Sequence, residues 1–129
     1  MNKTLLIIGA TLGVLGIILG AFAAHGLEKL VDADAIKSFE TGVRYQLYHA
    51  FFLLILGSTS FLSLKVKKTI FYLVLFGVIF FSVSIYGLAT NSLSSFDFKT
   101  IAFITPLGGL LLIAAWMVML IGIIRNKVD

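Results

Sequence analysis

Four long stretches without Asp, Glu, Lys or Arg divide this sequence, and they constrain its fold more than any other feature. They cover residues 4–24, 45–64, 69–96 and 100–124. An α-helix rises about 1.5 Å per residue, so about 20 apolar residues cross the roughly 30 Å hydrocarbon core of a bilayer. Each stretch is therefore long enough to cross a membrane, and the third needs only residues 69–90 to do so.

The composition identifies lipid as the solvent of these stretches. Hydrophobic residues make up 60% of the 129-residue chain, charged residues only 12%, and the mean hydropathy is +1.09. A soluble globular domain has about 25% charged residues. In lipid the backbone must satisfy its own hydrogen bonds, and the stretches lack the alternation of barrel strands. The sequence predicts an all-α integral membrane protein, in which residues 1–129 form one domain with four transmembrane helices.

The residues that are missing also exclude classes of site. Cysteine is absent, which excludes disulfides and thiolate metal sites, and we expect no cofactor. The net charge of +4 would suggest nucleic acid as the partner of a soluble protein. Here the positive charges lie at the ends of apolar stretches, so we expect membrane lipids, and not nucleic acid, as partners. A homo-oligomer or a membrane-protein partner stays open.

The first stretch has two interpretations. Its basic start and the small residues of Ala21-Phe22-Ala23 resemble a secretory signal peptide with its cleavage site. The apolar run is longer than a signal peptide needs, and two Gly-x-x-x-Gly pairs indicate helix packing. These pairs are Gly9 with Gly13 and Gly16 with Gly20. We therefore expect the first helix to be retained.

Basic residues predict the orientation, because cytoplasmic loops of membrane proteins carry an excess of Lys and Arg. With four spans, both termini and the loop after the second span share one side. That side carries six basic residues, Lys3, Lys65, Lys67, Lys68, Arg125 and Lys127. The opposite side carries four, Lys29, Lys37, Arg44 and Lys99. We predict a multi-pass protein of the cytoplasmic (cell) membrane with both termini in the cytoplasm.

Residues 26–44 form a long connection between the first and second spans. Asp32 or Asp34 can cap a helix there, and Ile36, Phe39 and Val43 fall on one face of it. The sequence therefore predicts a short amphipathic helix at the membrane surface, or a helical extension of the second span. The same phase does not extend back through the preceding leucines, so we expect a break at residues 32–34.

Polar residues concentrate at the end of the first span and the beginning of the second. The candidate functional cluster consists of His25, Glu28, Glu40, Arg44, Tyr45, Gln46, Tyr48 and His49. An ionisable group within a membrane usually faces protein or water, so His49 is the sharpest candidate, and with His25 it could relay protons. The alternative is structural: these aromatic rings anchor a helix at the interface, or His49 bonds a backbone carbonyl. Two histidines without cysteine are too few for zinc unless carboxylates or another chain join them.

The third and fourth spans carry weaker signals. Small polar groups that could bond across helices lie at Ser82, Ser84 and Tyr86. A candidate helix break in the fourth span comprises Thr105, Pro106, Gly108 and Gly109. Because proline lacks a backbone donor, the break could expose carbonyls as a gate, or the proline could lie within the first turn, where it is tolerated. Trp116 lies deeper than interfacial tryptophans do, so we expect it to pack against another helix.

Three blocks resemble a known family. They are GAFAAHGL at residues 20–27, TGVRYQLYHA at 41–50, and ITPLGG at 104–109 followed by AAW at 114–116. In this order they resemble the YgdD/YwdK-like family of small bacterial membrane proteins, related to a eukaryotic small transmembrane protein. Ala23 and Ala115 stand where the family often has glycine. The resemblance implies four membrane helices and no established activity, and it directs attention to the motif positions without supplying chemistry: His25, Tyr45, Gln46, Tyr48, His49, Thr105, Pro106, Gly108 and Gly109.

Three hypotheses for function follow. We favour a non-enzymatic accessory or scaffold protein that binds lipid or a membrane partner through its glycine-rich faces. A small oligomeric channel or transporter for protons, ions or small solutes would use His25, Tyr45 and His49. An intramembrane enzyme acting on lipid or quinone would need His49 as a base in a deep cavity. No Ser-His-Asp arrangement or phosphate-binding loop is recognisable, so we assign no catalytic, cofactor or metal residues.

Overall fold

The computed structural model describes residues 1–126, and these residues form helices with no β-strand. The first half of the chain contains α1 (Asn2–His25), a 3₁₀ turn η1 (Leu27–Lys29) and α2 (Ala33–Ser58). The second half contains α3 (Leu64–Val78), a π-helical turn η2 (Ile79–Val83), α4 (Ser84–Ala89), the 3₁₀ turns η3 (Asn91–Leu93) and η4 (Phe98–Ile101), and α5 (Ile104–Arg125). Because α3, η2 and α4 follow one another without interruption, residues 1–126 form four long helical segments.

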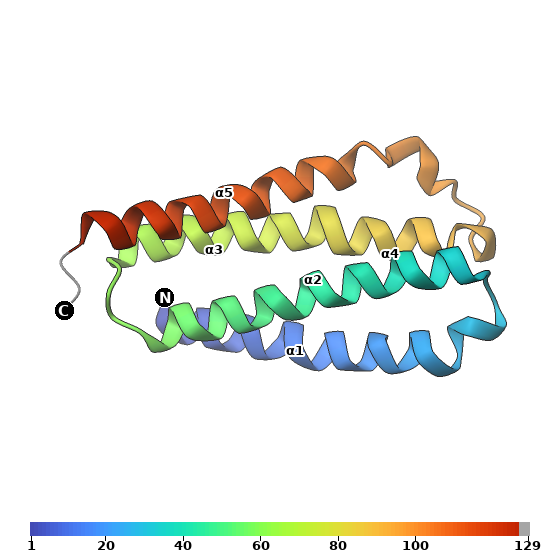
Figure 1. Cartoon of the computed structure of the whole chain (residues 1–129), viewed down its shortest axis with the longest axis horizontal. Helices are drawn as coiled ribbons and strands as arrows, with labels where there is room; N and C mark the ends of the chain where they lie inside the picture. Colours follow the sequence, from blue (N-terminus) through green and yellow to red (C-terminus); the bar gives the residue numbers. More distant parts are fainter. Residues whose placement is uncertain (127–129) are drawn as a thin grey trace.

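The segments form two antiparallel pairs that lie side by side (Figure 1). The first pair is α1 with α2, and the second is α3–η2–α4 with α5. The pairs meet where α2 packs along η2 and α4. The N-terminus, residues 59–63 and the end of α5 lie at one end of the bundle, called here the terminal end. The connections at residues 26–32 and 90–103 lie at the opposite end.

Three of the segments are long and apolar enough to cross a membrane, namely Asn2–Lys29, Leu64–Ala89 and Ile104–Arg125. The fourth, α2, is less apolar because polar residues occupy its first half. It compensates by burial, since ten of its residues are buried, including the side chains of Gln46 and His49. The fold is therefore that of an all-α membrane protein in which the most polar helix buries one face against the others.

The start of α2 agrees with the sequence prediction. Asp32 is the N-cap, and its Oδ1 accepts a hydrogen bond of 2.8 Å from the backbone N–H of Ala35. The helix then continues to Ser58. The predicted break at residues 32–34 and the helical extension of the second span are thus confirmed. Phe39 and Val43 are buried on one face of this extension.

Glycines on α1 allow close packing within the chain itself. A Cβ atom at Gly9 would lie 3.0 Å from the carbonyl oxygen of Ala50, and one at Gly16 would lie 2.7 Å from Leu47 Cδ2. Gly20 faces Val43 at 3.5 Å, whereas Gly13 faces open space. Three of these four glycines therefore pack against α2 within the chain itself, and Gly13 is the one of the four that does not.

The structure also corrects the candidate helix break. The helix α5 begins at Ile104 and runs unbroken to Arg125, so Pro106 lies in its first turn, where a missing N–H is tolerated. The irregular turn lies instead in the neighbouring segment, at η2. Gly108 is the residue of α5 that fits against it, because a Cβ there would lie 2.6 Å from the carbonyl carbon of Phe80. No gate of exposed carbonyls forms at Thr105 to Gly109.

Candidate functional site

His49 is buried between the two helix pairs, and its two ring nitrogens have different partners. Its side chain is 3% exposed. Nε2 lies 3.1 Å from Nε1 of Trp116, and Nδ1 lies 2.6 Å from the backbone carbonyl oxygen of Tyr45. An indole N–H can only donate, so Nε2 must accept and the proton belongs on Nδ1, which donates to Tyr45. Both nitrogens of a neutral His49 are therefore satisfied.

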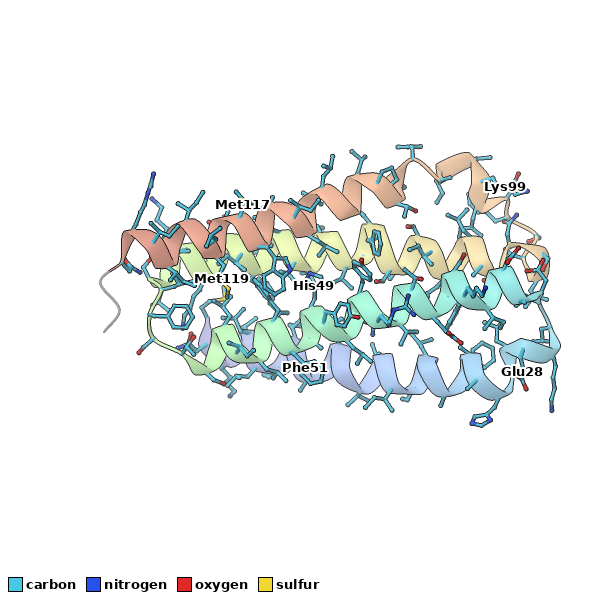
Figure 2. The ribbon with its side chains drawn as sticks, viewed as in Figure 1. Glu28, His49, Phe51, Lys99, Met117 and Met119 are labelled. Carbon is cyan, nitrogen blue, oxygen red and sulfur yellow. The ribbon has the colours of Figure 1, made fainter. Side chains whose placement is uncertain are left out.

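The structure does not bring His25 and His49 together. Phe22 packs on Phe39 near the connection at residues 26–32, whereas Gly9 faces Ala50 about a third of the way along α1. His49 is consequently level with the first half of α1, and His25 is exposed at the end of that helix. Figure 2 shows Glu28 at that same end, far from His49. The hypothesis of a proton relay between the two histidines is wrong.

The other members of the polar cluster also separate. Glu28, Glu40 and Arg44 are exposed. Arg44 Nη2 donates a hydrogen bond of 3.0 Å to Thr41 Oγ1 on the preceding turn. Tyr45 and Tyr48 are 39% and 52% exposed, and their rings lie against each other with centroids 5.6 Å apart. The residues predicted as one cluster therefore occupy three separate environments: the exposed end, the outer face of α2 and the interior.

Gln46 belongs to the interior, where it joins three segments. Its Nε2 donates to the carbonyl oxygen of Leu12 on α1 at 2.9 Å, and its Oε1 accepts a bond of 2.6 Å from the hydroxyl of Tyr86. Gly16 leaves the space for this amide, since a Cβ there would lie 3.5 Å from Gln46 Nε2. The buried amide thus ties α1, α2 and α4 together.

Two serines complete this set of bonds, as the sequence predicted for the third span. Ser82 Oγ donates to the carbonyl oxygen of Gly42 at 2.8 Å. Ser84 Oγ lies 2.6 Å from Thr105 Oγ1, which links α4 to the first turn of α5. Together with the bond from Tyr86, these contacts confirm that the small polar groups of this segment bond across helices. The bonds of Ser82 and Tyr86 join the two helix pairs, whereas the contact of Ser84 lies within the second pair.

Trp116 divides the open seam between α2 and α5 into two grooves. A groove of about 550 Å³ lies on one side, and a groove of about 450 Å³ lies on the other. Tyr45, His49 and Trp116 line both of them. The larger groove is otherwise lined by Tyr48, Phe51, Phe52, Ile55 and Met119. Neither groove has a charged residue in its wall, so the seam is an aromatic surface open to the bilayer.

Lys67, one of the basic residues predicted to mark the loop after the second span, is buried. Its side chain is 2% exposed, and its Nζ donates to Asn2 Oδ1 at 2.9 Å and to the carbonyl oxygen of Thr59. It therefore joins α1, the end of α2 and α3 at the terminal end. A signal existed in the sequence, because Lys67 falls on the same helical face as Ile70, Phe71 and Val74, which are all buried.

The described residues do not bring together a set of metal ligands. Within residues 1–126, no group of three or more His, Cys, Asp or Glu side chains lies close enough to hold a metal ion. His49 contributes no open coordination position either, since its ring nitrogens already bond Trp116 and Tyr45.

The fold and these contacts define a small all-α membrane protein with a satisfied polar interior. Its family follows from comparison with known proteins. The family model described as a protein of unknown function (DUF423) matches residues 19–109. The chain belongs to this family, as its three sequence blocks indicated.

Relatives extend the match over almost the whole chain. A UPF0382 membrane protein of Staphylococcus saprophyticus is 36% identical over 93% of this chain and 96% of its own length. The UPF0382 inner membrane protein YgdD of Escherichia coli is 35% identical over 98% of this chain and 93% of its own. A UPF0382 membrane protein of Haemophilus influenzae is 32% identical over 98% and 97%, respectively. No solved structure matches the chain.

Proposed function

We propose that this protein is a non-catalytic accessory protein of the membrane, which holds a lipid by its hydrocarbon chain in the larger groove beside Trp116. The observation that carries this proposal is the open seam between α2 and α5. Its wall is almost entirely aromatic and aliphatic, and the groove of about 550 Å³ lies beside α5, which is long and apolar enough to cross a bilayer. Hydrocarbon is the occupant whose chemistry fits this wall.

Selectivity in such a groove must come from packing. Moving an acyl chain from the surrounding lipid into the groove yields no hydrophobic free energy, because both environments are apolar. Association within a bilayer therefore depends on close contact and on hydrogen bonds. The groove supplies contact through Phe51, Phe52 and Ile55 on one wall and Trp116 on the other. Phe52 and Trp116 brace each other with ring centroids 4.4 Å apart, which gives the groove a fixed shape.

The satisfied interior favours lipid binding over transport or catalysis. Within residues 1–126, every buried side-chain nitrogen or oxygen has a hydrogen-bond partner. A path for protons or ions would need polar groups that are free to bind them, and the predicted gate is absent. An enzyme with His49 as base would need a free ring nitrogen facing a substrate, whereas Trp116 covers Nε2.

We further propose a multi-pass arrangement with both termini in the cytoplasm. The terminal end carries Lys3, Lys65, Lys68 and Arg125 at its surface, and an excess of basic residues is typical of the cytoplasmic side. Reporter fusions at either end of the chain test this orientation. Fusions that are active only outside the cytoplasm would refute it.

Trp116 provides a direct test of the groove because it is the only tryptophan of the chain. Purified protein in detergent is titrated with a phospholipid that carries bromine on its chains, which quenches nearby indole fluorescence. We expect quenching that saturates at about one lipid per protein, together with a monomer that does not assemble through this face. Quenching that only rises in proportion to the lipid added would refute the proposal. If the protein instead forms a dimer and the lipid no longer quenches Trp116, a second copy of the chain covers the seam.

A pair of variants separates the groove from general lipid contact. Phe51 is 60% exposed in the groove wall, and Ile17 is 68% exposed on α1, outside that wall. Phe51→Ala removes about six ring atoms, each worth about 0.1–0.2 kcal/mol per contact, so half-saturation should need about three to eight times more lipid. Ile17→Ala should leave the titration unchanged. Equal effects of the two substitutions would contradict specific binding in the groove.

A further inference from the structure

Acidic and basic side chains of the described residues are distributed unevenly between the two ends of the bundle. The terminal end presents only basic side chains, and Lys3, Lys65, Lys68 and Arg125 are exposed there. The described acidic residues all lie in α2, at its preceding turn or at the connection beside η4: Glu28, Asp32, Asp34, Glu40 and Asp97. The terminal end is therefore complementary to an anionic surface. Asp129 lies outside the described residues.

One pocket at this end combines polar and apolar walls. It has a volume of about 300 Å³ and lies between the beginning of α3 and the end of α5. Ser63, Arg125 and Asn126 provide its polar part. Val66, Val118 and Ile121 provide its apolar part, and on α5 Val118 and Ile121 lie about two turns and one turn before Arg125. The pocket thus has a charged mouth and an apolar wall, as an amphiphile requires.

Local contacts hold the mouth of this pocket in place. Asn126 Nδ2 donates to the carbonyl oxygen of Phe61 at 2.6 Å, which fastens the end of α5 to the connection before α3. Ser63 caps α3, and its Oγ accepts a hydrogen bond of 3.3 Å from the N–H of Val66. Gly122 lets the connection approach, since a Cβ there would lie 2.7 Å from Leu62 Cδ2. Arg125 therefore projects from a fixed base.

We propose that this pocket binds an anionic phospholipid of the leaflet at the terminal end. Arg125 donates paired hydrogen bonds to the phosphate, as guanidinium groups do. The partial positive charge at the N-terminus of α3 adds a favourable field, and no acidic residue in the first turn opposes it. One acyl chain lies along Val66, Val118 and Ile121. The site is separate from the groove beside Trp116, and the proposal does not depend on lipid binding in that groove.

The test is native mass spectrometry of the purified full-length protein with phosphatidylglycerol or phosphatidylcholine of identical chains. We expect the protein to retain one more phosphatidylglycerol than phosphatidylcholine, because a lipid held by its chains beside Trp116 would be retained with either headgroup. Arg125→Gln should lower the preference for phosphatidylglycerol about tenfold or more, because hydrogen bonds to charged groups are among the strongest in proteins. Equal retention of the two lipids by the unaltered protein would overturn the proposal.

Controls separate this pocket from diffuse attraction. Lys3→Gln removes one charge at the same end outside the pocket, and Lys99→Gln removes one at the opposite end, where Figure 2 shows Lys99. Neither should change the preference by more than about twofold, since exposed charges interact weakly with distant ones. A loss as large as that of Arg125→Gln in either control would overturn the site.

A last arm distinguishes a lipid from free phosphate. Inorganic phosphate at the concentration of the lipid should not displace phosphatidylglycerol, because it cannot fill the apolar part of the pocket. Displacement would show a simple anion site and would overturn the lipid assignment. Phe51→Ala should leave phosphatidylglycerol retention unchanged, and Arg125→Gln should leave the quenching of Trp116 unchanged. The two lipid proposals can therefore fail separately.

Discussion

Replacement of Gly108 by alanine should force α5 away from the π-helical turn η2. A Cβ at this position would lie 2.6 Å from the carbonyl carbon of Phe80 and 2.9 Å from the carbonyl oxygen of Gly77. Both are backbone atoms, so no side-chain rotation relieves the overlap. Carbon atoms attract best at about 3.5–4.0 Å, which means that the two segments must separate by about 1 Å.

The cost of that separation can be worked out from packing. A gap of about 1 Å forfeits up to half of an attraction of about 0.1–0.2 kcal/mol per atom pair. If the seam contains about 40 pairs, as many as one buried leucine makes, about 2–4 kcal/mol is lost. Alanine returns about 1 kcal/mol through its better helix propensity. The free energy of unfolding should therefore fall by about 1–3 kcal/mol, which is also typical of overpacked cores.

Gly109→Ala is the matched control for this change. Its Cβ would lie 3.7 Å from Phe81 Cδ1, an ordinary contact, so the gain of up to about 1 kcal/mol in helix propensity should remain. Both variants are unfolded by sodium dodecyl sulfate in mixed micelles, with the emission of Trp116 as the probe. If Gly108→Ala proved as stable as Gly109→Ala, the close approach of α5 to η2 would be refuted.

Three further substitutions test the polar contacts. Lys67→Met should lower the free energy of unfolding by about 1–3 kcal/mol, because the carbonyl of Thr59 and the amide of Asn2 lose their donor. Lys68 is exposed, so Lys68→Met should change this free energy by less than about 0.5 kcal/mol. Equal losses of stability in the two variants would place Lys67 at the surface. Tyr86→Phe should cost about 0.6–1.7 kcal/mol by the same assay, and no loss at all would argue against its bond to Gln46. His49→Leu should shift the emission of Trp116 to shorter wavelength, because the indole N–H loses its acceptor; unchanged emission would mean that the bond does not form.

The outline of the fold could be predicted because it depends on local signals. Charge-free stretches of sufficient length predict helices in lipid, and the aspartate at position 32 predicts where α2 begins. These local signals did not predict which residues of different helices lie at the same level of the bundle. The stretch without charges begins at Tyr45, but α2 already begins at Ala33, so His49 lies about 24 Å along the helix instead of near its start. The apparent proximity of His25 and His49 disappeared with that shift.

Side-chain direction was the second feature that sequence signals left open. Three lysines stand at the beginning of α3, and only Lys67 turns inward. Basic residues near a membrane end normally serve as an orientation signal, so the buried one was hidden by its neighbours. The π-helical turn η2 has no comparable signal, because it depends on how Gly108 of a distant segment fits against it.

The structure moves the search for function from the interior to the seams between helices. Polar groups inside a membrane protein are costly unless paired, and they often mark a pathway when they are free. Here Gln46, Ser82 and His49 each bond a residue of the other helix pair, so they specify how the two pairs of helices dock. Phe51 and Arg125 have the opposite character, because each projects from a fixed helix into a pocket open to lipid. If the protein acts on lipid or through lipid, substitutions at these two positions should impair it while leaving its stability intact, and substitutions in the interior should do the reverse.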